Sequence, residues 1–136
     1  MIGVGAFGHN HARVYHQLAQ QGEPVRLVGI VDADLTRADA IAREFGCRPF
    51  GSVEQLTTTH SEVQAASVAV PTVRHLEIGR ALMEAGVDVL VEKPLAASRA
   101  DADELIRLAQ SLGRIGQVGH LERFNPAVRR TAIFLQ

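Results

Sequence analysis

The sequence has one cysteine, no tryptophan and one tyrosine among its 136 residues. The single cysteine, Cys47, excludes an internal disulfide and any metal site built from several thiolates. So few aromatic side chains argue against a stacking platform for nucleic-acid bases. The 14 basic and 15 acidic residues leave a net charge of −1, so no strong field attracts nucleic acid or an anionic membrane. We therefore expect neither as a partner.

Long hydrophobic runs are also missing. No apolar stretch reaches the ~18 residues needed to cross a bilayer, and the N-terminus lacks the basic flank and apolar segment of a signal peptide. The sequence contains no low-complexity segment and no linker-like shift in composition. Its length is that of one domain, and we expect a cytoplasmic protein.

Short apolar stretches alternate with helical patterns along the chain. This alternation is typical of parallel βαβ units with helices on both faces of one sheet. Five stretches rich in β-branched residues are expected as buried strands: 25–31, 48–50, 66–70, 87–91 and 115–118. Apolar residues at helical spacing within 35–45, 76–83 and 105–112 predict helices that face the core. The predicted fold class is α/β, a doubly wound parallel sheet.

The expected first strand is unusually short. Only Met1 and Ile2 precede Gly3, although the first strand of such a sheet lies at its centre. We expect that the natural strand begins a few residues earlier, or that another chain completes the sheet.

Three glycines, Gly3, Gly5 and Gly8, lie in the run Met1-Ile-Gly-Val-Gly-Ala-Phe-Gly. In a dinucleotide-binding turn, the first glycine permits a tight strand-to-helix turn and the second lets the backbone approach a pyrophosphate. The third lets the helix pack on the strand. The N-terminus of the following helix supplies N–H groups and a positive dipole end for the phosphates. The spacing therefore predicts a dinucleotide site.

Asp32 ends the next apolar strand, about one βα unit later, where an acid accepts hydrogen bonds from the adenosine ribose. The alternative is a helix-capping role, which Asp34 can fill instead. A carboxylate here repels a 2′-phosphate, which favours NAD over NADP. Arg37, in the first turn of the next helix, weakens this preference, so NADP stays possible.

Lys93 is the only lysine in the chain. It follows an apolar strand within Glu92-Lys93-Pro94, and the carboxyl ends of parallel strands are where such sheets bind ligands. An ammonium donates to a substrate hydroxyl, and its pKa shifts on desolvation more readily than that of a guanidinium. The alternative is an exposed loop lysine paired with Glu92.

Five motifs together resemble the N-terminal domain of the Gfo/Idh/MocA oxidoreductases, over nearly the whole chain. They are Gly3-Val-Gly-Ala-Phe-Gly8 with His11, the strand end at Asp32, Val70-Pro-Thr-Val-Arg-His75, Val91-Glu-Lys-Pro94 and Gly119-His-Leu-Glu-Arg-Phe-Asn-Pro126. The resemblance implies a Rossmann domain followed by a substrate domain. It also implies hydride transfer between NAD(P) and a sugar, nucleotide sugar or polyol, in a homo-oligomer. The last motif is similar to members that act on nucleotide-linked amino sugars, such as UDP-N-acetylglucosamine 3-dehydrogenases.

The resemblance also implies roles for individual residues. Lys93 would be the catalytic residue that orients or polarises the reacting hydroxyl. The implied cofactor-binding set is Gly3, Gly5, Phe7 and Gly8 at the pyrophosphate, Asp32 at the adenosine ribose, Pro71, Thr72 and His75 near the nicotinamide half, Glu92 at the nicotinamide ribose, and Lys93, Pro94 and His120. Thr72 has a second interpretation as a helix cap, and the two histidines as ordinary surface or core residues.

No metal site is expected. His9, His11 and His16 share one helix, but no third ligand at suitable spacing joins His11 and Asp32. We expect residues 1–136 to form a dinucleotide-binding domain with a truncated first strand and without the family's substrate domain, and hence with little catalysis alone. The alternative is a non-catalytic dinucleotide-binding or interaction module, which the short length favours.

Overall fold

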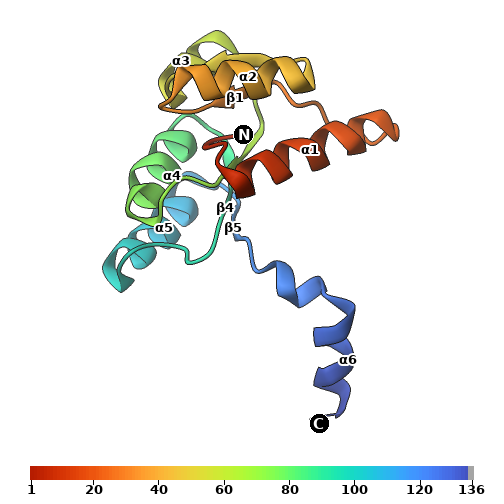
Figure 1. The fold of residues 1–136 in the computed structure, drawn as a ribbon. Coiled ribbons are helices and arrows are strands. Elements are labelled where there is room, and N and C mark those ends of the chain that lie inside the picture. The colour runs from red at the N-terminus through yellow and green to blue at the C-terminus, as the bar shows by residue number, and fades with distance from the viewer. Residues whose placement is uncertain (135–136) are drawn as a thin grey trace.

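The computed structural model describes residues 1–134, which form alternating helices and strands (Figure 1). Leu135 and Gln136, the end of the expected domain, lie outside the described residues. The elements are α1 (Ala6–Gln20), β1 (Gly29–Val31), α2 (Leu35–Phe45), β2 (Arg48–Phe50), α3 (Val53–Thr59), β3 (Ala65–Val68), the 3₁₀ helix η1 (Thr72–Arg74), α4 (His75–Glu84), β4 (Asp88–Val91), α5 (Arg99–Leu112), β5 (Gly116–Val118), the 3₁₀ helix η2 (Leu121–Phe124) and α6 (Pro126–Phe134).

All strand pairs are parallel. β1 pairs with β2, and β4 lies between β3 and β5. Ile2 joins the two groups, because it pairs in parallel with Val31 on one side and with Val68 on the other. The resulting order is β2, β1, Ile2, β3, β4, β5, in which the direction of winding reverses at Ile2. This is the strand order of a dinucleotide-binding doubly wound sheet, and it confirms the predicted fold class.

Ile2 occupies the place of the first strand. Its N–H donates to the Ser67 carbonyl over 2.8 Å, and its own carbonyl accepts from the Ala69 N–H over 2.8 Å. Met1, Ile2 and Val4 are all buried. The predicted strand over 25–31 is shorter than expected, because its ladder with β2 and Ile2 extends only over Gly29–Val31.

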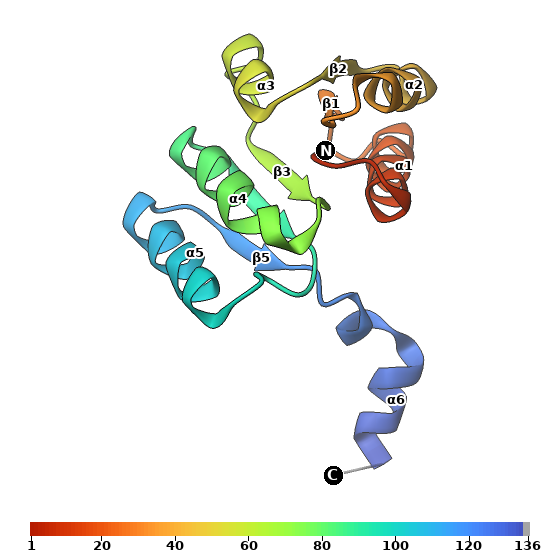
Figure 2. The ribbon, with the colours of Figure 1, turned by 60° about the vertical axis from the view of Figure 1, so that its left-hand side comes forward.

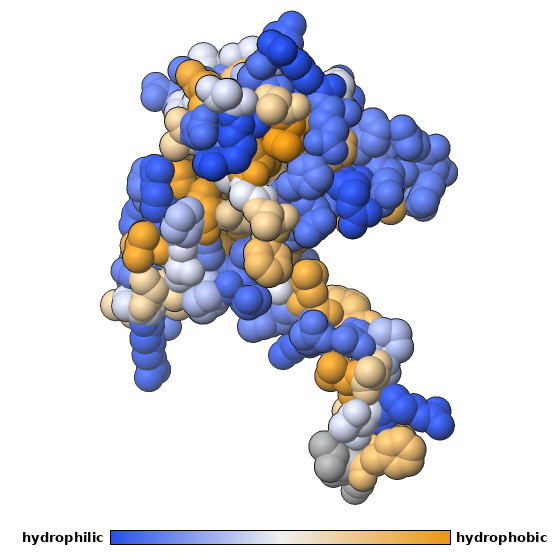
Figure 3. All heavy atoms as spheres, in the orientation of Figure 1, coloured by the Kyte–Doolittle hydropathy of each residue, from blue (hydrophilic) through white to orange (hydrophobic). Residues whose placement is uncertain are grey.

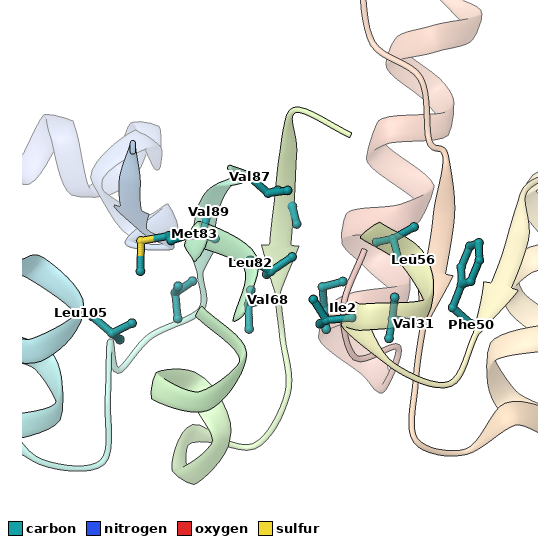
Figure 4. Close-up of a cluster of buried hydrophobic side chains, with 13 residues drawn as sticks. Ile2, Val31, Phe50, Leu56, Val68, Leu82, Met83, Val87, Val89 and Leu105 are labelled. Carbon is teal, nitrogen blue, oxygen red and sulfur yellow. The ribbon is translucent and has the colours of Figure 1, made fainter. Parts of the chain in front are cut away.

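Helices lie on both faces of the sheet (Figure 2). The core therefore forms two layers, one on each face. Successive strand residues point to opposite faces. Ile2 and Val31 therefore face α3, α4 and α5, where they join a cluster with Leu56, Leu82 and Leu105 (Figure 4). Met1 and Ile30 face α1 and α2 instead, in a second cluster whose helix residues are small or aromatic: Ala12, Ala38, Ala42 and Phe45.

Helix ends follow the residues that the sequence offers. Asp34 caps α2 by accepting from the N–H groups of Thr36 and Arg37, which leaves Asp32 free of that role. Ser98 caps α5 in the same way, through the Asp101 N–H. Gly46 and Gly113 end α2 and α5 with positive φ, as C-terminal glycines commonly do.

η2 and α6 extend away from the two-layered body as an arm (Figure 1). The space-filling view shows apolar side chains along this arm (Figure 3). The exposed apolar residues there are Leu121, Phe124, Val128, Ile133 and Phe134. Within residues 1–134, no helix combines the length and apolarity needed to cross a membrane.

Candidate functional site

The chain turns sharply between Ile2 and α1, and two glycines make this turn possible. Gly3 has a φ of +79°, and a Cβ there would lie 2.9 Å from the Ala69 backbone. Gly8 packs against the turn so closely that a Cβ would fall on the Gly3 carbonyl oxygen. A side chain at either position therefore requires the backbone to move.

Gly5 differs from these two glycines, because a Cβ at this position would meet nothing within 4 Å. It is the residue before α1, and no side chain among the described residues caps this helix end. The first turn of α1 also contains no acidic residue. Unpaired N–H groups at a positive helix end, beside open space, form a site suited to a phosphate.

Asp32 lies at the carboxyl end of β1, and its side chain is buried at 7% exposure. Its carboxylate accepts hydrogen bonds from the N–H groups of Val4 and Asp34, each over 2.9 Å. Burial by itself would raise the pKa of Asp32. Hydrogen bonds from Arg37 and from those two N–H groups outweigh burial, so the pKa is lowered from its ordinary value of 3.8.

Arg37 donates two hydrogen bonds to the Asp32 carboxylate. Its Nε donates to Asp32 Oδ2 over 3.1 Å, and its Nη2 donates to Oδ1 over 2.7 Å. The guanidinium is half exposed at the entrance to this corner. A ribose that approaches Asp32 therefore meets a cation as well as an anion.

These groups line one cleft of about 750 Å³ at the carboxyl ends of the central strands. Gly3, Gly5, Phe7, Asp32 and Pro71 of the predicted set all contribute to its wall, together with Arg37 and Ser52. Another hollow, of about 580 Å³, lies at the amino ends of β1 and β3 and contains none of the predicted residues in its lining. The position of the first cleft, where the winding of the sheet reverses, is the usual ligand position in this architecture.

Thr72 and His75 lie beyond Pro71. Thr72 is half-buried and begins η1, but it caps neither η1 nor α4, so the capping interpretation is wrong. His75 is only 1% exposed. Its Nδ1 lies 3.0 Å from the Pro94 carbonyl oxygen and its Nε2 lies 3.0 Å from that of Val70. The structure thus favours the core interpretation of His75, which ties the Pro94 loop to the end of β3 and does not face the cleft.

Glu92 and Lys93 follow β4 at the same edge of the sheet. The Glu92 carboxylate is buried, and its Oε1 lies 2.9 Å from Nε2 of His11. Lys93 is exposed, and its Nζ lies 5.5 Å from the centre of the Phe7 ring. Lys93 therefore pairs with the aromatic ring of the glycine turn, whereas the partner of Glu92 is His11.

Pro94 and His120 complete the predicted set. Both are exposed and both follow strands at the carboxyl edge, Pro94 after β4 and His120 after β5. The Lys93–Pro94 peptide bond is cis. No group of three or more histidine, cysteine or acidic side chains within residues 1–134 is arranged to hold a metal ion.

Comparison with known proteins decides the family. The profile of the Gfo/Idh/MocA proteins, described as "Oxidoreductase family, NAD-binding Rossmann fold", matches residues 1–120. The chain belongs to this family. Residues 1–120, which include the glycine turn and Asp32, thus belong to an NAD-binding Rossmann domain.

Among relatives within the Gfo/Idh/MocA family, UDP-N-acetylglucosamine 3-dehydrogenase of Acidithiobacillus ferrooxidans is 37% identical over 129 residues. Its solved structure superposes with a TM-score of 0.85 and covers 96% of this chain. Inositol 2-dehydrogenase 1 of Saccharopolyspora erythraea is 33% identical over 93% of the chain. The structure of GenD2 from gentamicin A biosynthesis, in complex with NAD, has a TM-score of 0.77 and 31% identity over 87% of the chain.

The chain spans only part of these Gfo/Idh/MocA proteins. It covers 38% of the Acidithiobacillus dehydrogenase and 37% of the Saccharopolyspora one in sequence. In the structural comparisons it covers 40% of the Acidithiobacillus chain and 32% of GenD2.

Two features of this Gfo/Idh/MocA site were missed or only partly seen in the sequence. The two hydrogen bonds from Arg37 to Asp32 could be expected from the local sequence. The residues are five positions apart, Asp32 at a strand end and Arg37 in the first turn of the next helix. The pairing of His11 with Glu92 has no such local signal, since 81 residues separate them. Only the tertiary fold, in which α1 packs beside β3 and its His11 side chain reaches the residue after β4, brings that pair together.

Proposed function

We propose that this chain is the cofactor-binding part of an oxidoreductase that transfers a hydride between a nicotinamide cofactor and a CH–OH carbon of a sugar, nucleotide sugar or polyol. One observation carries the proposal. The only lysine of the chain lies against Phe7, a residue that also lines the cleft. An ammonium that can donate a hydrogen bond to a hydroxyl and a dinucleotide cleft are thus adjacent, which suits the orientation of a substrate hydroxyl beside a bound cofactor.

The residues of the glycine turn suit the pyrophosphate, because Gly3 and Gly8 permit the turn and Gly5 leaves open space before α1. Asp32 accepts from the adenosine ribose after Arg37 yields one of its two hydrogen bonds. Since Arg37 also offers a cation there, we propose that NADP binds as well as NAD, with NAD preferred. The nicotinamide half of the cofactor lies among Thr72, Glu92, Pro94 and His120. His75 supports the Pro94 loop through its contact with the Pro94 carbonyl oxygen.

A bound nicotinamide supplies the carbon that accepts or releases the hydride. Lys93 donates a hydrogen bond to the substrate hydroxyl oxygen, which orients the hydroxyl and stabilises the negative charge that develops there as its proton passes to a general base of the substrate-binding part. An ammonium donates three hydrogen bonds, so Lys93 can contact Phe7 and a hydroxyl together. Substrate recognition then depends on parts of the protein beyond this cleft. The sugar class is supported by relatives named for UDP-N-acetylglucosamine and inositol.

Calorimetric titration of the folded chain with NADH, and in parallel with NADPH, tests the cofactor half of the proposal. We expect saturable binding of both, with NADH tighter. Absence of NADH binding by a folded chain would refute it.

The catalytic half is tested by supplying the substrate domain of a relative in trans and measuring NADH formation from a nucleotide sugar or inositol. Turnover that Lys93→Met abolishes, with NADH affinity retained, is expected of an oxidoreductase. Dinucleotide binding with no turnover under any such condition would favour the alternative, a non-catalytic cofactor-sensing module. A cytoplasmic location and a homo-oligomeric state stay predictions.

A further inference from the structure

Two side chains of α1 reach the segment that follows β4. Phe7 and His11 are four residues apart on this helix and so lie on one face of it. They contact two consecutive residues: Phe7 meets the Lys93 ammonium, and His11 meets the Glu92 carboxylate. The first turns of α1, which follow the glycine turn, are thus joined at two points to the predicted catalytic segment.

Glu92 is the buried member of this arrangement, with its side chain 11% exposed. A carboxylate accepts hydrogen bonds but donates none when ionised, so His11 is the donor from Nε2. The other carboxylate oxygen accepts from the Lys93 N–H over 3.2 Å. The two oxygens therefore link the histidine directly to the backbone of the lysine.

The residue that follows the neighbouring strand β5 is a glycine that leaves room for this carboxylate. A Cβ at Gly119, just after β5, would lie 3.0 Å from Glu92 Oε1. A buried carboxylate without a partner is costly, and His11 is the side chain that meets this one. The orientation of Glu92, and with it the start of the Lys93 segment, therefore depends on His11.

We propose that His11 is a positioning residue: through Glu92 it holds Lys93 beside Phe7, so that the pyrophosphate end of the cleft and the catalytic lysine move as one unit. The relevance to catalysis rests on the proposed function, in which Lys93 acts on the substrate hydroxyl. The positioning itself concerns only contacts within this chain.

The single lysine provides a direct test. In a chain labelled with [¹³Cε]lysine, only Lys93 gives a lysine side-chain signal, and the nearby Phe7 ring displaces that signal by its ring current. Phe7→Leu calibrates the displacement by removing the ring. We expect the Lys93 signal of the His11→Leu variant to lose most of this displacement. Without His11, Glu92 no longer holds Lys93 beside the Phe7 ring.

Two further variants separate positioning from a general effect on α1. His11→Gln places an amide donor at similar reach and should restore the displaced signal. His9→Leu removes another histidine of the same helix, whose partner Glu44 lies on α2 away from Lys93, and should leave the signal unchanged. A folded His11→Leu chain with a wild-type lysine signal would overturn the proposal.

If His11→Leu does not fold, Glu92→Met decides the question, since a thioether of similar length keeps neither of the two carboxylate oxygens that His11 and the Lys93 N–H contact. Loss of the displacement is then the expected result, and an unchanged signal would overturn the proposal. NADH titration of the wild-type chain is read separately. The wild-type lysine signal could be displaced, and His11→Gln could restore it, while the wild-type chain fails to bind NADH. That combination would refute the proposed function but support the positioning.

Discussion

The Asp32 side chain has two hydrogen-bonding roles. Its carboxylate closes the turn by accepting from the Val4 N–H, and it holds Arg37 at the mouth of the cleft. The same oxygens are the ones that a ribose would use. Under the proposed function, cofactor preference depends on a balance between this anion and this cation, which lie five residues apart in the sequence.

Substituting Asp32 with serine shifts this balance. Asp32→Ser removes the acceptors for the ribose hydroxyls and leaves the Arg37 guanidinium without its partner. NADH binding should weaken, and its advantage over NADPH should narrow. Calorimetric titration with both cofactors measures the change, and unchanged affinities for both would remove Asp32 from the site.

The pKa of Asp32 predicts how this residue affects stability with pH. Because hydrogen bonds in the folded chain lower the pKa below 3.8, the carboxylate stabilises the fold above that pH, and the contribution is lost as pH falls through the folded-state pKa. Asp32→Asn should thus be less stable than wild type near neutral pH, with a difference that shrinks in acid. Urea unfolding of both proteins across this range tests the prediction. A difference that is constant with pH would contradict it.

Among the elements, α1 and the turn before it show how closely helix and strand approach here. Gly3 is required because its φ is positive and the Ala69 backbone lies close to it. Gly8 is required because a Cβ would meet the Gly3 carbonyl oxygen, whereas Gly5 faces open space. Three glycines in one motif thus have different physical reasons. Gly3 and Gly8 preserve the fold, and Gly5 leaves the space before α1 open.

Alanine substitutions distinguish these roles. At Gly8 a Cβ would fall on the Gly3 carbonyl oxygen, so Gly8→Ala should push α1 away from the turn and cost about 1–3 kcal/mol or more. Gly5→Ala, the matched control, should fold with nearly wild-type stability and yet bind NADH more weakly, because the methyl group obstructs the pyrophosphate. Denaturant unfolding and calorimetry of both variants provide the comparison. Equal stability of the two would disprove the steric argument.

Over the whole molecule, residues 1–3 hold the halves of the sheet together, with Ile2 at their centre. Ile2 makes hydrogen bonds to both Ser67 and Ala69 on its β3 side, and it pairs with Val31 on the other. Its side chain, at 2% exposure, lies in the core cluster that α3, α4 and α5 cover. Ile2 thus belongs both to the hydrogen-bonded sheet and to the larger of the two core clusters.

Truncation of that side chain should be correspondingly costly. We expect Ile2→Ala to reduce the free energy of unfolding by about 2–5 kcal/mol, a large part of the ~5–15 kcal/mol of a typical domain. Ile133→Ala on α6 is the control, since Ile133 is 67% exposed and its loss should change stability by less than about 0.5 kcal/mol. Chemical denaturation followed by circular dichroism measures both. Comparable effects at the two positions would show that Ile2 is not central to the fold.

Several features could be read directly from the residues because they depend on local physics. Capping by Asp34 and Ser98 and the left-handed glycines Gly46 and Gly113 follow from short-range hydrogen bonding. The parallel, doubly wound class of the sheet follows from alternating strand and helix patterns with short connections. α3 was missed, since seven residues ending in three threonines carry little helical periodicity.

The sequence by itself determined the α/β class, the glycine turn and the family, because these depend on spacing within one βα unit or on several motifs in a fixed order. Only the tertiary structure decided which side chains meet. It buried His75 between carbonyl groups, paired Glu92 with His11 and placed Lys93 over Phe7. Such contacts arise where strands distant in sequence end at one edge of a sheet, and no local pattern encodes them.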